Sequence, residues 1–567
     1  MCLVPTKQYR KFAMTRKNKT LLNSKYLPRA FSISRVLLFI ALVMFSFYFV
    51  VYVLYTINLM QFPFDYDQGE GYELVDVVML SEGQLPYQDA ETYPFYGSIY
   101  PPVYHMMLVP FMWLFGPVYW YGRLISFLTT VVAAVAIGYA VYTEGNRTKQ
   151  ARFVAVLAGL AFLSSNVIYH IGPLFRQHIP MFMFETLAVV ILARANEIGD
   201  QKTRRRRMLW GFGLLILAGY TKQLAAFTAI AALIFIFIRN PRRAIVWGSG
   251  FTAVGVGIFA WLNIASKGHW WTQTITANVL AYMPDQADGL LRLFVDLHGW
   301  LLIPAVLLVI YELYFDRISI YSMWFIVGVP FSAYSAGTWG AGDSYYGTSI
   351  AAVCVLSGIF IARTLNREWT FRNNYLSHLI IDPLRKFAPQ TTLVMIVIVP
   401  MFYVAYGRTV LHMPTEGAVF DQVADILGIE ANAHGTFYDS AGRITGGYAD
   451  IGHFTTQEDI EGGNEIVALI NDLPEDAQII SEEAAFPLLT GKDVVTNSGL
   501  LNPLGKVGAY DSTELVQMIE NHEFGLVILR AQFFPMEVNV AIATYYEHST
   551  TIEMNGFDYF IMRPAVD

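Results

Sequence analysis

The sequence predicts a polytopic α-helical membrane protein with about 11 transmembrane helices, followed by a small extracytoplasmic α/β domain. Of its 567 residues, 55% are hydrophobic and 15% are charged, against roughly 25% charged residues in an average soluble domain. Apolar stretches long enough to cross a hydrocarbon core of ~30 Å recur up to residue 407. Beyond this residue the chain becomes polar and acidic. These observations exclude a soluble protein.

The net charge of -7 is distributed unevenly along the chain. Residues 1–407 contain 32 Lys and Arg against 20 Asp and Glu, whereas residues 408–567 contain 6 against 25. The main domain boundary is therefore expected near residue 407. An acidic domain of this kind is not expected to bind nucleic acid. The two cysteines, Cys2 and Cys354, are too few for a disulfide framework.

The membrane part is divided into eleven predicted spans, so the two termini lie on opposite sides of the membrane. Because Lys and Arg in short loops favour the cytoplasmic side, the topology that places 27 of the 32 basic residues on one side is preferred. It predicts a basic cytoplasmic tail (1–34), a membrane domain (35–407) and an extracytoplasmic domain (408–567). The spans are expected at about 35–57, 118–142, 152–169, 179–194, 208–221, 224–238, 244–265, 293–312, 318–335, 346–363 and 390–407.

The first outer loop (58–117) is the most unusual segment of the membrane part. Residues 58–101 contain eight Asp and Glu and no Lys or Arg. Asp65, Asp67 and Glu70 fall within six residues and repel one another unless they share a proton, a metal or a cation. The apolar series after them predicts a short interfacial helix, and residues 100–117 are interpreted as re-entrant or interfacial. Solvation alone is the competing explanation for most of these acids.

Five cations remain for the outer side, and three of them lie where the acidic loop is expected. Arg176, followed by His178, opens one span, Lys222 lies in a tight outer turn, and Arg123 enters another span. Cations beside carboxylates at the lipid boundary suit a lipid-linked phosphate, with a carboxylate as base. The alternative is that these side chains simply reach for lipid headgroups, which is favoured for the other two, Lys267 and Arg292.

Two further outer features have both a functional and a structural interpretation. The aromatic and glycine-rich loop 339–346 is typical of sugar or acceptor contacts, and also of an interfacial aromatic belt. Its Asp343 and Tyr345, together with Tyr100, are the candidate contacts. Glu185 falls inside a span and is expected to face the bundle interior.

The last 160 residues alternate between β-type and helical patterns, which predicts an α/β domain. They contain no phosphate-binding glycine loop, zinc-ligand spacing or nucleophile elbow. Strands are expected at 477–481, 493–496, 525–530 and 558–562, and helices at 464–471, 482–490 and 512–523.

Short motifs in the membrane part follow one another in a recognisable order. They are Gly83-x-Leu85-Pro86-Tyr87, Tyr100-Pro101-Pro102, Leu114 to Pro117, Gly122 to Ser126, and Tyr220 to Gln223. In this order, after an acidic outer loop, they resemble the GT-C superfamily of integral-membrane glycosyltransferases. The likeness is to its family 39-like branch, which includes protein mannosyltransferases and the aminoarabinose transferase of lipid A.

The resemblance implies transfer of a sugar from a polyprenyl-phosphate donor to a glycan, lipid or protein acceptor. The transfer takes place on the non-cytoplasmic face of the plasma (inner) membrane. It implies Asp67 as general base, with Asp65 second and Glu70 adjacent. Arg123, Arg176, Lys222 and His178 would bind the donor phosphate. Where many relatives have Arg-x-Asp, this chain has Arg176-Gln177-His178, so a second carboxylate is missing.

Other functions stay open on the sequence alone. A polytopic transporter or lipid-linked sugar flippase is the main alternative, although no internal repeat is evident and few polar residues lie mid-span. A receptor or assembly protein that works through its outer domain is the third hypothesis. No cofactor is required, but clustered carboxylates suit Mg²⁺ or Mn²⁺.

Overall fold

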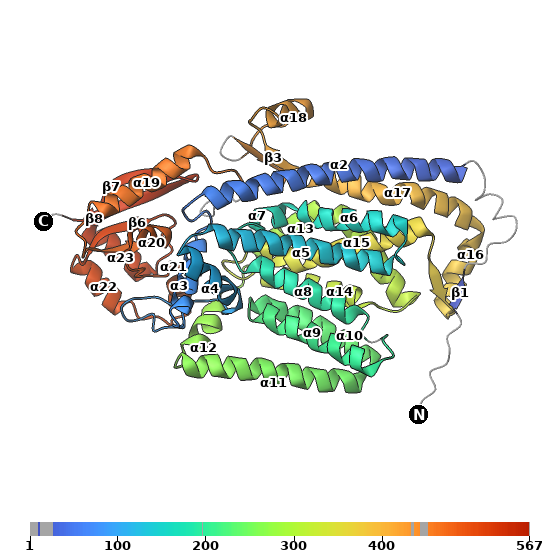
Figure 1. Cartoon of the computed structure of the whole chain (residues 1–567), viewed down its shortest axis with the longest axis horizontal. Coiled ribbons are helices and arrows are strands. Elements are labelled where there is room, and N and C mark those ends of the chain that lie inside the picture. Colours follow the sequence, from blue (N-terminus) through green and yellow to red (C-terminus); the bar gives the residue numbers. More distant parts are fainter. Residues whose placement is uncertain (1–8, 12–25, 196, 433–435, 443–451, 566–567) are drawn as a thin grey trace.

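The computed structural model describes residues 9–11, 26–195, 197–432, 436–442 and 452–565. Long, roughly parallel helices form one bundle, with the C-terminal α/β region at one end and the short strand β1 (Tyr9–Lys11) at the other (Figure 1). The cavity described below lies where the bundle meets the α/β region.

Every predicted span falls on a helix. Six described helices are long and apolar enough to cross a membrane, namely α2, α5, α11, α13, α15 and α17. The structure is therefore that of an integral membrane protein. The helices on the predicted spans are α2 (Tyr26–Gln61), α5 (Trp120–Glu144), α6 (Lys149–Leu163) with α7 (Asn166–Ile171), α8 (His178–Ala193), α9 (Gln201–Gly219), α10 (Ala226–Arg239), α11 (Pro241–Ala265), α13 (Pro284–Tyr314), α14 (Ile320–Ser335), α15 (Gly347–Asn366) and α17 (Ala388–Thr409).

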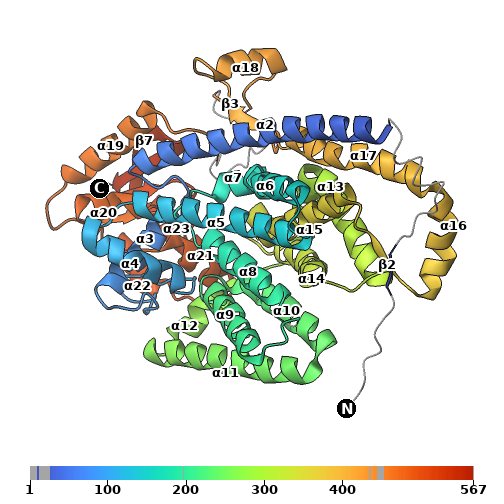
Figure 2. The same ribbon diagram turned by 45° about the vertical axis from the view of Figure 1, so that its right-hand side comes forward.

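Burial differs sharply between these helices. The apolar window of α15 is 89% buried and that of α11 is 6% buried, and both views place α11 at the edge of the bundle (Figures 1 and 2). A helix that is apolar all round and unburied requires lipid around it. We therefore assign α15 to the centre of the bundle and the exposed faces of α11 to lipid.

Four of the helices that follow short loops begin with an N-cap hydrogen bond. The side chains of Thr148, Asp200, Asn240 and Ser319 each accept a hydrogen bond from the backbone N–H three residues on. Such caps satisfy N–H groups that have no partner inside the helix. Helices α6, α9, α11 and α14 therefore begin at residues that the sequence marks clearly.

The first outer loop folds into two short helices, α3 (Glu70–Ser81) and α4 (Val103–Phe115). The first is the helix predicted after the acidic cluster. The second has 13 residues and is therefore ~20 Å long, too short to cross a core of ~30 Å. Both lie between the bundle and the α/β region (Figure 1), where they form part of the cavity wall.

The C-terminal region contains a four-stranded sheet in the order β5-β6-β8-β7. β5 is parallel to β6, and β8 is antiparallel to both β6 and β7. The sequence analysis missed β7, α21 and α23. The elements are β5 (Gln478–Ser481), β6 (Phe524–Leu529), β7 (Tyr546–Met554), β8 (Phe557–Pro564), α19 (Gln457–Asn471), α20 (Ala485–Thr490), α21 (Ser498–Lys506), α22 (Thr513–Glu520) and α23 (Met536–Tyr545).

The strand predicted at 493–496 is wrong. Among the described residues this segment makes one bridge, between Thr496 and Phe95 of the first outer loop. Its apolar residue Val495 packs in a cluster that also includes Phe95 and Leu500. The segment therefore contacts the first outer loop and is not a strand of the sheet.

Smaller elements complete the fold. The pair β1 (Tyr9–Lys11) and β2 (Thr370–Arg372) is antiparallel, which brings Arg10 and Lys11 beside the basic loop after α15. α2 begins at Tyr26, inside the predicted tail, and apart from β1 the rest of that tail lies outside the described residues. Further elements are α12 (His269–Thr274), η2 (Thr276–Asn278), η3 (Asp343–Tyr346), β3 (His412–Pro414), α18 (Phe420–Leu427) and β4 (Phe437–Asp439).

Candidate active site

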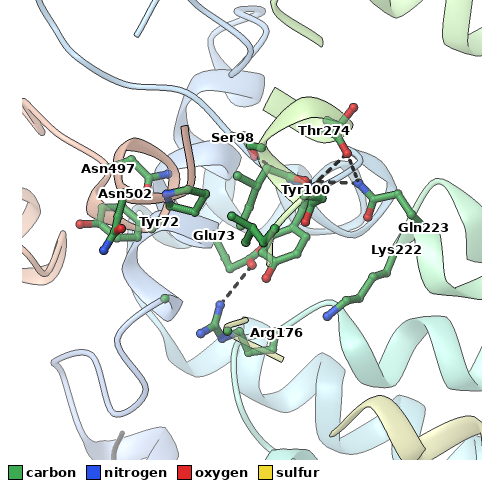
Figure 3. Close-up of a pocket in the computed structure, with 18 of the residues that line it drawn as sticks. Tyr72, Glu73, Ser98, Tyr100, Arg176, Lys222, Gln223, Thr274, Asn497 and Asn502 are labelled. Atoms are coloured by element: carbon green, nitrogen blue, oxygen red, sulfur yellow. Dashed lines mark hydrogen bonds and ion pairs between the residues drawn. The ribbon is translucent and has the colours of Figure 1, made fainter. Parts of the chain in front are cut away.

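A cavity of about 430 Å³ lies between one end of the helical bundle and the α/β region. It is lined by α3 with the residues before it, the segment 98–100, the turn between α9 and α10, the segment 274–280, the loop 338–345 and the start of α21. Figure 3 shows Glu73, Arg176, Lys222, Asn497 and Asn502 around it. Asp67, Arg176 and Lys222, which the sequence analysis placed in one site, line this single cavity.

Asp67 and Arg176 form the charged pair of the cavity. Arg176 Nε donates a hydrogen bond of 2.6 Å to Asp67 Oδ2, and Arg176 Nη1 lies 3.6 Å from Glu73 Oε1. A Cβ at Gly69 would lie 2.1 Å from Arg176 Nη1, closer than atoms can approach. Glycine at this position therefore allows the guanidinium to lie against the start of α3.

Lys222 reaches the cavity from the turn between α9 and α10. Its Nζ forms a hydrogen bond with His178 Nε2 and lies 5.3 Å and 5.1 Å from the ring centroids of Tyr100 and Tyr345. Burial, and then the nearby Arg176 charge, lower the pKa of Lys222 to about 7. The aromatic rings offset part of this cost through cation–π attraction. The Lys222 amine can thus bind an anion in the cavity, but at neutral pH it is protonated in only part of the molecules.

A carboxylate–histidine group at the cavity wall was missed by the sequence analysis. His105 Nε2 forms a hydrogen bond with Glu73 Oε2 and lies 3.6 Å from Asp76 Oδ2. Asp76 also accepts hydrogen bonds from Tyr96, at 2.9 Å, and from Ser98. Burial raises the pKa of Asp76 to about 7, against the opposing influence of His105 and Ser98.

Glu73 and Asp76 are therefore two further carboxylates of the cavity lining. They are three residues apart on α3 and so share one helix face. Acids at this spacing in an otherwise apolar helix, with a histidine in the following apolar segment, were the signal that could have found them. Glu73 also supplies a second carboxylate beside Arg176, which the Arg176-Gln177-His178 sequence lacks.

Glu70 and Arg123 pair with each other away from the cavity lining. Arg123 donates to Glu70 at 2.6 Å and 3.1 Å and also to the carbonyl oxygens of Leu59, Phe62 and Phe64. Glu70 accepts the backbone N–H of Phe175 at 2.6 Å. Both side chains are fully buried. The pair joins the first outer loop to α5 and to the turn before α8.

Asp65 is likewise buried outside the described cavity lining. It accepts a hydrogen bond from the Tyr119 hydroxyl. Burial and the neighbouring Glu483 raise the pKa of Asp65 well above its ordinary value. Of the three clustered acids, the structure places Asp67 alone among the described residues that line the cavity.

Only some of the candidate sugar contacts line the cavity. Tyr100 and Tyr345 line the cavity, whereas Asp343 is buried at the start of η3 and lies outside its lining. The α/β region supplies residues that the sequence analysis did not single out: Asn497, Ser498, Gly499, Asn502, Pro503 and Phe533. Only the packing of distant segments could reveal these residues.

Metal binding is not supported by a visible cluster. Across the described ranges, no group of three or more His, Cys, Asp or Glu side chains is arranged to hold a metal ion. The Mg²⁺ or Mn²⁺ that the acidic loop could bind stays a prediction.

Comparison with known proteins finds a structural likeness. No protein-family profile and no curated protein sequence matches the chain. ArnT of Cupriavidus metallidurans bound to undecaprenyl phosphate matches over 92% of this chain and 97% of its own, with a TM-score of 0.53 and 13% identity. Its apo structure matches over the same shares, with a TM-score of 0.54 and 12% identity. The oligosaccharyltransferase of Archaeoglobus fulgidus matches over 95% of this chain and 74% of its own, with a TM-score of 0.48 and 11% identity.

The likeness to ArnT spans both the helical bundle and the α/β region, because nearly the whole of each chain is covered. It agrees with the order of motifs in the membrane part. At this level of sequence identity it identifies the architecture, and the chain has the GT-C fold.

Proposed function

We propose that this protein is a membrane glycosyltransferase that moves a sugar from a polyprenyl-phosphate donor to an acceptor. The observation that carries the proposal is the meeting of Asp67, Arg176 and Lys222 in one cavity at the end of a GT-C bundle. ArnT binds undecaprenyl phosphate in its solved structure, which supports a polyprenyl phosphate as the carrier here. The acceptor is a glycan, lipid or protein hydroxyl.

In the proposed reaction, an acceptor hydroxyl oxygen forms a bond to the anomeric carbon of the sugar. The bond from that carbon to the phosphate oxygen breaks, and polyprenyl phosphate leaves with the electron pair. Asp67 takes the hydroxyl proton, since its carboxylate lies at the cavity wall and Arg176 holds it in place. General base catalysis of this kind contributes about 100- to 10,000-fold to rate.

Lys222 and Arg176 bind the donor phosphate and stabilise the charge that develops on it as it leaves. His178 acts through Lys222, to which it is hydrogen-bonded. Arg123 and Glu70 have a structural role, because their partners are each other and the backbone of the same buried region.

Glu73 is the second carboxylate of the proposed site. His105 holds its Oε2, and Oε1 faces Arg176 at 3.6 Å. Glu73 thus positions Arg176 from the side opposite to Asp67.

We also propose that the cavity lies on the non-cytoplasmic face of the plasma membrane. The basic loops predicted for the other end of the bundle, where β1 pairs with β2, support this orientation. The acidic α/β region then lies outside the cytoplasm.

The test is a transfer assay with the purified full-length protein in lipid nanodiscs. The protein is given undecaprenyl phosphate carrying a radiolabelled sugar and a membrane glycolipid extract as acceptor. The proposal expects labelled product together with free undecaprenyl phosphate, and neither product with Asp67→Asn. Movement of the intact donor across vesicles, without cleavage of the sugar–phosphate bond, would instead support a flippase.

A further inference from the structure

The cavity has two chemically different ends. Arg176 and Lys222 lie on one side, and Asn497 and Asn502 of the α/β region lie on the other (Figure 3). Asp67 belongs to the charged side, because it accepts a hydrogen bond from Arg176. Residues 408–567 contain 25 acidic and 6 basic side chains. The residues that this region contributes to the cavity lining are nevertheless all uncharged. A wall without charge in so acidic a region suits a neutral ligand.

Asn497 shows the feature of a binding group. It precedes α21, a position where asparagine normally caps the helix, but its side chain makes no cap hydrogen bond. Its Nδ2 instead donates to the carbonyl oxygen of Gly97 at 2.7 Å. Its Oδ1 is buried, and among the described residues it has no hydrogen-bond partner. An unpaired buried acceptor is unfavourable, and a ligand hydroxyl would supply the missing hydrogen bond.

The rest of this end has matching chemistry. Asn502 is 8% exposed and lines the cavity one turn further along α21. Asn278, from the membrane half, adds a carboxamide to the cavity lining, and Trp339 adds an aromatic face. Carboxamides both donate and accept hydrogen bonds, as sugar hydroxyls do. Aromatic faces pack against the apolar faces of sugar rings.

The wall is also held firmly in place. The Tyr72 hydroxyl donates to the Glu482 carbonyl oxygen at 2.8 Å and lies 3.0 Å from Ser498 Oγ. Lys506 Nζ lies 3.3 Å from the ring centroid of Trp339. These contacts join α21 to α3 on one side and to the loop 338–345 on the other.

We propose that Asn497 and Asn502 form a subsite for an uncharged, hydroxyl-rich sugar, supplied to the cavity by the α/β region. The subsite binds the sugar while the charged end binds the phosphate. This inference rests on the proposed function and deepens it, because it names the class of sugar. It favours an uncharged sugar over a cationic amino sugar, because the residues that the α/β region contributes to the cavity lining are all uncharged.

The test compares binding of three probes by the full-length protein in nanodiscs. They are undecaprenyl phosphate, undecaprenyl-phosphate glucose and undecaprenyl-phosphate aminoarabinose. Wild type is compared with Asn502→Ala, Asn497→Ala and the control Asn471→Ala. Asn471 is an exposed residue at the end of α19, outside the cavity lining. Thermal unfolding of each variant shows whether it is folded.

We expect Asn502→Ala and Asn497→Ala to weaken binding of the glucose-carrying lipid by about three- to tenfold, the effect of one lost hydrogen bond. Binding of undecaprenyl phosphate should stay within about twofold in both variants, and Asn471→Ala should match wild type for all probes. Because Asn497→Ala also frees the Gly97 carbonyl, Asn502→Ala decides the outcome if Asn497→Ala unfolds.

Two results would overturn the subsite. One is equal loss of affinity, or no loss, for the free and the glucose-carrying lipids. The other is tighter binding of the aminoarabinose lipid than of the glucose lipid by wild type. Failure of wild type to bind any of the three probes would overturn the proposed function itself, which separates the two claims.

Discussion

The first outer loop supplies the carboxylates of two carboxylate–arginine pairs, and these carboxylates are three residues apart in the sequence. Asp67 pairs with Arg176 at 2.6 Å, and Glu70 pairs with Arg123 at 2.6 Å. The first pair lines the cavity, and its side chains are 9% and 16% exposed. The second pair is fully buried, and Arg123 donates to three further carbonyl oxygens.

This difference indicates that one pair serves the reaction and the other stabilises the fold, although both carboxylates belong to one short segment. A buried pair with every donor satisfied cannot bind a substrate without first breaking, which is costly. A pair that borders a cavity keeps atoms available for a ligand. The same residue types therefore have different tasks, and the following variants test that division.

The largest effect is expected for Asp67→Asn. The amide keeps the shape of the side chain and can still accept from Arg176, but it cannot take a proton. We expect kcat for sugar transfer to fall about 100- to 10,000-fold, measured with saturating donor. The midpoint temperature of thermal unfolding should stay close to that of wild type. Retention of more than about a tenth of the wild-type rate would remove Asp67 from the role of base.

Glu70→Gln is expected to act on stability and not on the chemical step. It leaves the buried Arg123 charge without its carboxylate, and breaking a buried pair costs about 3–5 kcal/mol. The midpoint temperature of thermal unfolding in nanodiscs should be lower than for wild type, whereas kcat per folded molecule should stay near the wild-type value. The double variant Glu70→Gln/Arg123→Met removes both charges and should recover part of the loss. A stable Glu70→Gln protein without activity would reverse the assignment of the two pairs.

Lys222 is expected to make phosphate binding depend on pH. Since its pKa is lowered to about 7, the ammonium is present below that pH and is lost above it. Affinity for undecaprenyl phosphate should therefore fall as the pH rises from 7 to 8.5. Lys222→Arg keeps its charge and should remove this fall, and Lys222→Met should weaken binding about tenfold at pH 6.5. An unchanged pH profile in Lys222→Arg would contradict this role.

The smallest effect is expected for His105→Gln. The variant loses the imidazole that holds Glu73 and faces Asp76. We expect kcat to fall about three- to tenfold, with the donor KM within about twofold. The pH profile of kcat should also shift, because Asp76, whose pKa is raised to about 7, loses its neighbouring imidazole. A loss of stability with an unshifted profile would indicate that His105 only supports the fold.

The sequence allowed the helices to be predicted well because each one leaves a local mark. Apolar windows lie within the helix they define, and capping residues such as Asp200 and Asn240 lie directly before it. The meeting of Asp67, Arg176 and Lys222 could also be predicted, since charge is costly at a lipid boundary and the topology put all three at one end.

The finer assignment within the acidic cluster could not be predicted. Asp65, Asp67 and Glu70 differ in which distant side chain each one meets: Tyr119, Arg176 and Arg123 respectively. Long-range packing also decides that Thr496 pairs with Phe95 and not with the sheet. Long-range packing likewise places Asn497 and Asn502 near α3, although more than 400 residues separate them from this helix in the sequence. No local pattern records such contacts.

The central claim is that the Asp67–Arg176 end of the cavity, and not the Glu70–Arg123 pair, holds the donor phosphate. The most direct measurement is an experimental structure of the full-length protein with undecaprenyl phosphate bound. The account predicts phosphate oxygens within hydrogen-bond distance of Lys222 Nζ and of the Arg176 guanidinium, with the Glu70–Arg123 pair intact. Phosphate bound to Arg123 with the Glu70 contact broken, or bound outside this cavity, would contradict it.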